Sequence, residues 1–337
     1  MPRREYLLIG PSIDRALRWA LAEPDAGDMV TLSGRTSPLR SLIRSEPLDQ
    51  PPILLWKHFR IDEPRALARK TVRFYRDHRL AAAKLMPDIP LLFADGALSS
   101  FSQVAQLRRF GGVMSVGRAA EYVRAVELAR GELGGDDVLL VTLFSPLALI
   151  GLWCGPVGLR EMADGERPVA HAVLWALAGV VHDLAAACVD AGADGVYYSC
   201  WGQDVLSDGE YAELGVPYDL AGLRGAAGAE FRLLHLHGAV DGGLDRYARY
   251  PVQVVGWSEV ESSITLEAGA AALAGKLVMG GIAENRSGPV NPATVARIAA
   301  LVKHLGPRFV VAPGCSLPDD TGDAAMASLR ALVSDEV

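Results

Sequence analysis

From residue 51 onward, short apolar runs typical of buried strands alternate with longer stretches whose apolar positions recur at helical spacing. The apolar runs predict eight strands, at Ile53–Trp56, Ala81–Leu85, Val138–Leu143, Gly195–Tyr198, Leu233–His237, Val252–Val255, Lys276–Met279 and Phe309–Ala312. The stretches between them predict helices over Pro64–His78, Ala119–Leu133, Val169–Ala191, Ser263–Ala274 and Pro292–Leu305. Strands that alternate with helices pair in parallel through right-handed crossovers. Eight such units in about 280 residues predict a TIM (β/α)8 barrel, and a doubly wound open sheet is the alternative.

Two sites carry a polar cap followed by proline, the pattern that begins a helix: Ser37-Pro38 and Asn291-Pro292. Before residue 37 the pattern is less regular. It predicts an amphipathic helix over Gly10–Ala22 and turns over Glu23–Gly34. We therefore expect an N-terminal extension over residues 1–36, packed on a single barrel domain over residues 37–337.

The most informative polar positions are His235 and His237, which lie two residues apart at the end of the apolar run Leu233–Leu236. Side chains alternate between the faces of a strand, so both imidazoles would point the same way. Neutral imidazole is a frequent zinc ligand. Cys315, which follows the last predicted strand, is the candidate third ligand. The alternative is two histidines with separate hydrogen-bonding roles.

Other polar side chains also fall at or near the carboxyl ends of the predicted strands, where TIM barrels place their active sites. We expect catalytic roles for a first set, namely His58, Asp88 and Glu259. We expect a second set to contact the substrate, namely Lys57, Lys84, Ser145, Tyr198, Cys200 and Gln203. Lys84 lies inside an apolar run, where a buried ammonium would need a partner.

Composition excludes several classes of function. The formal net charge of −7, without a cluster of Lys or Arg, gives no footprint for nucleic acid. No run reaches the roughly 18 to 20 uncharged apolar residues that a membrane span needs, and the N-terminus does not resemble a signal peptide. The four cysteines are far apart and predict neither a disulfide framework nor a zinc knuckle. We expect a soluble, cytoplasmic protein.

Several short motifs, in their order and spacing, resemble the uroporphyrinogen decarboxylase superfamily from about Ser37 to the C-terminus. These motifs are Pro51–Trp56, Ala191–Gly195, Gly280–Ile282 and Ala312–Pro318. The superfamily fold is a TIM barrel, so the resemblance implies the fold that the periodicity predicts. The superfamily contains porphyrinogen decarboxylases and also zinc-dependent methyltransferases that act with corrinoid proteins and thiols.

Most of the porphyrin-handling residues of the decarboxylases have no counterpart in this chain. Their arginine-rich segment after the first strand is replaced by Trp56–Asp62, with one lysine and one arginine, and lysine does not replace arginine in bidentate carboxylate binding. Asp88 matches their aspartate after the second strand. The stretch Ile150–Trp153 lacks their tyrosine, and Cys315 stands where they carry histidine.

The methyltransferase branch binds zinc through a His-x-Cys element after the fifth strand and a cysteine after the eighth. The matching positions here are His235-x-His237 and Cys315, with one cysteine replaced by histidine. The resemblance thus implies a zinc-dependent methyl or alkyl transferase with a small thiol-like acceptor and a methylated corrinoid, carried by a partner protein, as the candidate donor. The alternative is a metal-independent decarboxylase of uroporphyrinogen III or a related acidic molecule. A third reading is a non-catalytic barrel that binds a tetrapyrrole or a protein partner. A monomer and a homodimer are both compatible with the sequence.

Overall fold

The computed structural model describes residues 37–91, 96–106, 118–273, 275–284 and 291–332. The helix predicted over Gly10–Ala22 and the turns over Glu23–Gly34 lie outside these residues, as does the extension over residues 1–36 as a whole.

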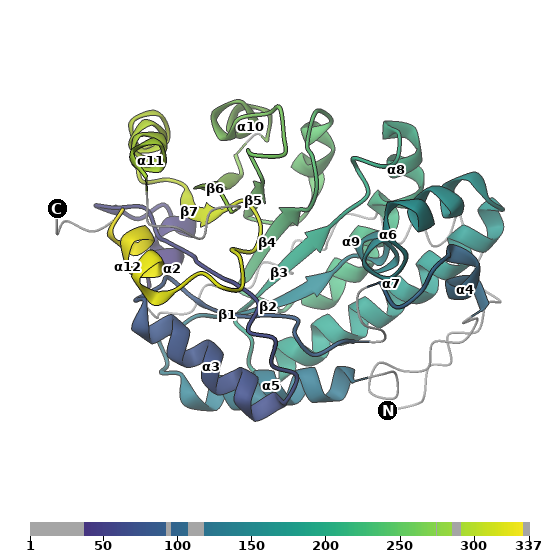
Figure 1. Cartoon of the computed structure of the whole chain (residues 1–337), viewed down its shortest axis with the longest axis horizontal. Helices are drawn as coiled ribbons and strands as arrows, with labels where there is room; N and C mark the ends of the chain where they lie inside the picture. Colours follow the sequence, from purple (N-terminus) through teal and green to yellow (C-terminus); the bar gives the residue numbers. More distant parts are fainter. Residues whose placement is uncertain (1–36, 92–95, 107–117, 274, 285–290, 333–337) are drawn as a thin grey trace.

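The centre of the fold is a curled sheet of seven parallel strands, hydrogen-bonded in the order β1 to β7 (Figure 1). The strands are β1 (Ala83–Leu85), β2 (Leu139–Phe144), β3 (Gly195–Cys200), β4 (Phe231–Leu236), β5 (Val254–Trp257), β6 (Leu277–Ile282) and β7 (Val310–Pro313). Each strand pairs with the next one along the chain, whereas the strand order of a doubly wound sheet reverses. The alternative of a doubly wound sheet was therefore wrong, and the fold is of the TIM-barrel type.

The strand predicted first, at Ile53–Trp56, was wrong as a regular strand. This segment forms only isolated bridges, from Ile53 to Val311 and from Lys57 to Leu317. Pro51 and Pro52 supply no N–H group, which weakens a ladder at this position. The segment nevertheless lies between the two ends of the sheet. Leu54 donates a backbone hydrogen bond to Val311 of β7, and Ile53 accepts one from Ala81, two residues before β1.

Helices surround the sheet, with α3, α5 and α7 along one side and α10 and α11 on the opposite side in the view of Figure 1. The helices are α2 (Pro38–Ile43), α3 (Pro64–Asp77), α4 (Phe101–Gln106), α5 (Ala119–Glu132), α6 (Pro146–Asp164), α7 (Arg167–Asp190), α8 (Asp208–Leu214), α9 (Val216–Leu223), α10 (Leu266–Ala272), α11 (Pro292–Leu305) and α12 (Asp323–Ala331), with the 3₁₀ helices η2 (Arg224–Ala226) and η3 (Leu244–Arg249). The predicted helices are present with ends shifted by a few residues. Both predicted caps are confirmed, because Ser37 accepts from the backbone of Arg40 and Asn291 from that of Thr294.

One of these helices, α7, is long and apolar enough to cross a membrane, which the sequence analysis overlooked. The most apolar window of α7 is 56% buried inside the protein. Its apolar side chains pack into the layer between sheet and helices. We therefore interpret α7 as a core helix.

The core has two layers, which side-chain alternation along the strands separates. Residues that point outward from the sheet, such as Leu234 and Val255, pack against the surrounding helices. Residues that point inward, such as Leu233 and Val254, form a second cluster together with Leu39 of α2. Parallel strands covered on both faces carry apolar residues at nearly every position, which explains the continuous runs in the sequence.

Helix α2 closes the amino end of the sheet and is held there by a fully buried arginine. Arg40 is 0% exposed and bonds Glu230 through Nε and Nη2, at 2.9 to 3.1 Å. The guanidinium also donates to Asp194 at 3.2 Å and to the carbonyl of Asp136 at 2.7 Å. Glu230 and Asp194 immediately precede strands β4 and β3, and Asp136 lies three residues before β2. One side chain therefore ties α2 to the starts of three strands.

Glu230 and Asp194 are nearly buried, and replacing Arg40 by methionine would remove the guanidinium that both of them bond. We expect the free energy of unfolding to fall by about 3–5 kcal/mol, as when one member of a buried ion pair is removed, measured by urea denaturation. The control is Arg73→Met, because Arg73 pairs with Asp77 at the surface. The control should change stability by less than about 1 kcal/mol, and equal effects of the two substitutions would contradict the prediction.

Candidate metal centre

Strand β4 carries two histidines toward the interior of the sheet. Phe231 and Leu233 of β4 belong to the inner cluster, and the next inward position is His235. His237 follows the last residue of the strand, and its backbone N–H continues the ladder by donating to the carbonyl of Cys200 at 2.8 Å. The alternation predicted from the sequence is therefore present at both positions.

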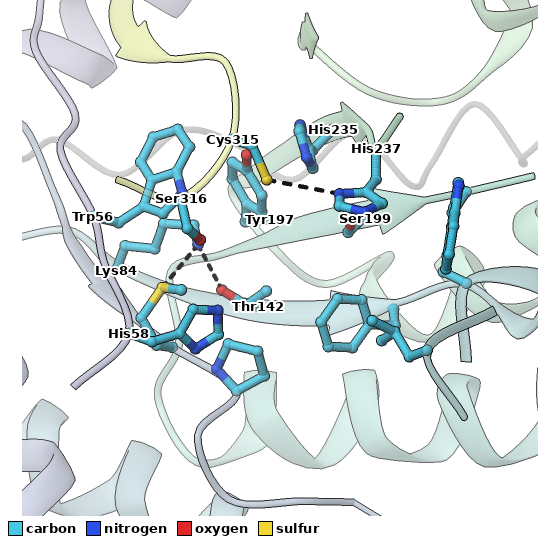
Figure 2. Close-up of a pocket in the computed structure, with 16 residues that line it drawn as sticks. Trp56, His58, Lys84, Thr142, Tyr197, Ser199, His235, His237, Cys315 and Ser316 are labelled. Carbon is cyan, nitrogen blue, oxygen red and sulfur yellow. Dashed lines mark hydrogen bonds between the residues drawn. The ribbon is translucent and has the colours of Figure 1, made fainter. Parts of the chain in front are cut away.

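Cys315, just after β7, completes a cluster of three ligand atoms. Its Sγ lies 3.6 Å from Nδ1 of His237, and one ligand atom from each of His235, His237 and Cys315 lies within 4.8 Å of the others. Figure 2 shows the three side chains grouped at the carboxyl ends of β4 and β7. Gly256 is the register partner of His235 on β5, and a Cβ there would lie 2.8 Å from the carbonyl oxygen of Met279. This position thus requires a residue without a side chain.

His235 is buried without a well-formed hydrogen bond. The residue is 4% exposed, and neither Nδ1 nor Nε2 has a partner in the described part of the chain. Burial lowers the pKa of His235 well below its ordinary value, and the neighbouring His237 and Lys84 add to this effect, while the backbone of Gly256 opposes it slightly. A buried polar group without a partner costs free energy. A metal ion would provide the missing partner.

The other two side chains have the protonation behaviour that metal binding requires. Burial lowers the pKa of His237, although Glu261 and Asp204 oppose the shift, so the imidazole is kept neutral. Burial raises the pKa of Cys315, which is then a thiol in the absence of metal. Metals bind neutral imidazole and thiolate, and they displace the thiol proton. Two imidazoles and a thiolate are donors that suit zinc, which often keeps a fourth position open.

The three side chains line a cavity of about 120 Å³ at the carboxyl end of the sheet. The wall also includes aromatic side chains, among them Trp56 and Tyr197, and the hydroxyl side chains of Thr142, Ser199 and Ser316. No arginine, aspartate or glutamate belongs to the part of this wall that the structure describes. The cavity therefore suits a small ligand and lacks the arginines that would grip a substrate with many carboxylates.

Lys84 reaches the cavity from β1 and is 6% exposed. Its Nζ donates to Thr142 Oγ1 at 2.9 Å and lies 4.0 Å from the centre of the Tyr197 ring (Figure 2). Burial lowers the pKa of Lys84 to about 7, against the opposing effects of Cys315 and Asp88. The amine is thus an uncommonly acidic lysine beside the candidate metal ligands.

His58 also lines this cavity and is bonded to Asp88. Nδ1 of His58 lies 2.6 Å from Oδ1 of Asp88, whose other oxygen accepts from the backbone N–H of Phe59 at 2.8 Å. Burial would raise the pKa of Asp88, but these hydrogen bonds outweigh it and hold the pKa below its ordinary value. Five of the predicted site residues therefore line one cavity: His58, Lys84, His235, His237 and Cys315. Asp88 does not line it but bonds His58.

A family model described as Uroporphyrinogen decarboxylase (URO-D) matches residues 92–335, more than half of the chain. The chain belongs to the uroporphyrinogen decarboxylase family. The resemblance drawn from the short motifs is thereby confirmed. A search of curated protein sequences found no match.

Solved structures of the same fold include methyltransferases. A methyltransferase from Methanosarcina mazei is 15% identical, with a TM-score of 0.66 over 88% of this chain and 96% of that one. A B12-independent methionine synthase from Shewanella, solved with selenomethionine, is 12% identical, with a TM-score of 0.55 over 84% of this chain and 93% of that one. A putative B12-independent methionine synthase from Listeria monocytogenes is 11% identical, with a TM-score of 0.53 over 80% of this chain and 84% of that one. At these identities the likeness concerns the fold.

Three of the predicted site residues, Lys57, Glu259 and Gln203, do not line the cavity and bond other groups instead. Nζ of Lys57 donates to the carbonyl oxygens of Asp319 and Thr321, in the loop after β7. Glu259 pairs with Arg297 and lines a separate cavity beside α11. Gln203 is close to the metal ligands, since it donates to the carbonyl of His237 at 2.5 Å. This contact fixes the loop after β4 rather than the cavity wall.

Ser145, Tyr198 and Cys200 lie on the outward side of the sheet, in the layer beneath the helices. Ser145 caps α6, and Tyr198 and Cys200 point outward from β3. Ser145 and Cys200 face the fully buried carboxyl of Asp219 on α9. Two tyrosine hydroxyls, from Tyr211 and Tyr250, donate to this carboxyl at 2.8 and 2.9 Å.

The inward residues of β3, Tyr197 and Ser199, were missed by the sequence analysis. Both line the cavity, and the Tyr197 ring stacks on His235 with centroids 5.5 Å apart. All six residues of β3 are buried, so polarity along the strand does not distinguish its two faces. The register does distinguish them, because Ser199 pairs with His235 across the ladder. Neighbours in register point to the same face, but this register is known only from the structure, so the sequence held no signal that could have found them.

The first prediction from this site concerns metal content. We expect about one equivalent of zinc per chain in protein purified without added metal, measured by elemental analysis, because the three donors fit this ion. His235→Ala and Cys315→Ser should lose the metal. Matched controls are His182→Gln and Cys154→Ser, which remove the same side-chain types away from the cluster. A metal content near zero in the unmodified protein would contradict the prediction.

The second prediction concerns Asp219. Burial raises its pKa to about 6 despite the tyrosine hydrogen bonds. The folded state therefore holds this proton more tightly than the unfolded state, and the resulting stability is present below about pH 4 and is lost as the pH rises through 6. Relative to Asp219→Asn, we expect the unmodified protein to lose up to about 3 kcal/mol between pH 4 and 7. Urea unfolding across this range measures the difference, and parallel curves for the two proteins would be the opposite result.

Proposed function

We propose that the protein is a methyltransferase that holds zinc through His235, His237 and Cys315 and methylates a small thiol-like acceptor. The observation that carries the proposal is the convergence of three ligand atoms within 4.8 Å in a small cavity, with no other partner for either nitrogen of His235 among the described residues. The methyltransferase from Methanosarcina mazei and the two methionine synthases, one of them putative, share the fold and favour this reaction class.

Bound zinc would supply a Lewis acid that favours the thiolate form of an incoming thiol at neutral pH. The protein's own residues would position the acceptor. Trp56 and Tyr197 would contribute aromatic surface to the wall around its carbon chain, and Lys84, whose Nζ lies over both rings, would place a hydrogen-bond donor on the same wall. As the sulfur–carbon bond forms, the bond between the methyl carbon and its donor breaks. A methylated corrinoid on a partner protein is our candidate donor.

The charge of the site bears on the acceptor. Two neutral imidazoles and one thiolate leave a divalent ion with one net positive charge, and no carboxylate lines the described wall. Lys84, when protonated, adds a second positive charge in a place of low dielectric. An uncompensated positive site of this kind favours a thiolate over a neutral thiol. A histidine at position 237, where the resembling methyltransferases carry cysteine, thus leaves the site more positive and increases its attraction for a thiolate.

The alternative, metal-independent decarboxylation of a porphyrinogen, has weaker support. Asp88, its central residue, does not line the cavity, because both of its oxygens are engaged by His58 and Phe59. The absence of arginine from the described wall leaves the substrate carboxylates without bidentate donors. Turnover of uroporphyrinogen III by metal-free protein would nevertheless favour this alternative over ours.

The proposal is tested by incubating zinc-loaded protein with methylcobalamin as donor and 2-mercaptoethanol as acceptor probe. We expect the methylated thioether to accumulate, detected by mass spectrometry, as the absorbance of methylcobalamin declines. His235→Ala should reduce the rate to background, whereas His182→Gln should leave it unchanged. Thioether formation that does not depend on His235, or its absence with the zinc-loaded protein, would count against the proposal.

A further inference from the structure

His58 lines the same cavity as the candidate metal ligands, and Asp88, which does not line the cavity, is bonded to His58. The Asp88 side chain is 1% exposed and holds Nδ1 of His58 at 2.6 Å, while the His58 side chain is 29% exposed. The second Asp88 oxygen is fixed by the N–H of Phe59 at 2.8 Å. The carboxylate is therefore held in place by the segment that carries the imidazole.

This arrangement determines which nitrogen of His58 carries the proton. A carboxylate only accepts hydrogen bonds, and the bonds to Asp88 hold its pKa below the ordinary value, so it is ionised near neutral pH. Nδ1 must then be the protonated nitrogen. In the described part of the chain, Nε2 has no hydrogen-bond partner. Its lone pair is free to accept a proton from a ligand.

We propose that His58 is a catalytic residue whose Nε2 accepts the proton of a ligand entering the cavity, and that Asp88 is the positioning residue that fixes its tautomer. The identity of the ligand as a thiol rests on the proposed function. The sulfur–hydrogen bond breaks, its electron pair stays on sulfur, and the proton moves to Nε2. The resulting imidazolium is stabilised by the Asp88 carboxylate at 2.6 Å.

Lys84 is the competing base on this wall, and its surroundings differ from those of His58. Its Nζ already donates to Thr142 and lies between the faces of Trp56 and Tyr197, at 4.9 and 4.0 Å from the ring centres. Burial lowers the pKa of Lys84 to about 7, but among the described residues no carboxylate bonds Lys84, so its protonated form lacks the partner that Asp88 gives to His58. We therefore assign proton acceptance to His58, and Lys84 keeps the role of a hydrogen-bond donor that positions the acceptor.

The first test needs neither metal nor activity. Nitrogen-15 NMR of metal-free protein labelled at histidine should show His58 with a protonated Nδ1 and an unprotonated Nε2, assigned by the signals that vanish in His58→Gln. Asp88→Asn keeps an acceptor and should keep this tautomer, whereas Asp88→Ala should lose the preference. A His58 protonated at Nε2 in the unmodified protein would overturn the proposal.

The second test counts protons when 2-mercaptoethanol binds zinc-loaded protein at pH 7, using a pH-indicator dye. The unmodified protein should release less than one proton per thiol bound, because His58 retains part of it. His58→Gln should release a full proton, Asp88→Asn should release more than the unmodified protein, and His182→Gln, which also removes an imidazole beside a carboxylate, should match the unmodified protein.

The outcomes separate this proposal from the proposed function. Equal proton release by the unmodified protein and His58→Gln would refute proton acceptance by His58. If Lys84→Met releases the full proton and His58→Gln does not, the role belongs to Lys84. If the thiol does not bind zinc-loaded protein at all, the proposed acceptor class is wrong. The His58 tautomer in the metal-free protein then tests the pair of His58 and Asp88 independently of the acceptor.

Discussion

The buried imidazole of His235, which has no hydrogen-bond partner among the described residues, is the constraint around which this molecule is organised. A polar ring at the end of an apolar interior costs free energy unless a ligand completes it. His235 lies on β4, which is hydrogen-bonded to a neighbouring strand on each side. The Tyr197 ring stacks on its imidazole, and Gly256 is its register partner on β5. These contacts hold the ring in the orientation that points it toward His237 and Cys315. Such preorganisation is what a catalytic metal site requires of its ligands.

The two ends of the sheet have opposite electrostatic character. At the amino end, the charges of Arg40, Glu230 and Asp194 satisfy one another, and nothing is left for a ligand. At the carboxyl end, His235 and the Nε2 of His58 have no such partner within the described residues. The ion pairs that stabilise the fold and the candidate site thus lie at opposite ends of the strands, as is usual in barrels of this type.

The sequence predicted most of the fold and the centre of the site, because both depend on local periodicity. The pair His235 and His237 followed from alternation along a single strand. The expected site residues that lie off the cavity wall were misplaced because their positions depend on pairing between segments. Tyr198 was chosen over Tyr197 because register is invisible in a run that is buried on both faces. Lys57 and Glu259 follow strands as expected, but their partners, the loop carbonyls at Asp319 and Thr321 and the side chain of Arg297, lie in parts of the chain that periodicity does not connect.

The Arg40–Glu230 bond also has a consequence for the order of events during synthesis. Its two members are 190 residues apart, so the arginine emerges from the ribosome long before its main partner exists. The inner cluster that Leu39 and Leu42 cover draws on every part of the sheet, up to Val310 and Ala312 of β7, so it is incomplete until late in synthesis. Contacts of such long range slow folding and leave apolar surface exposed in the meantime. Arg40 therefore ties helix α2 to the sheet only after the start of strand β4 has been made.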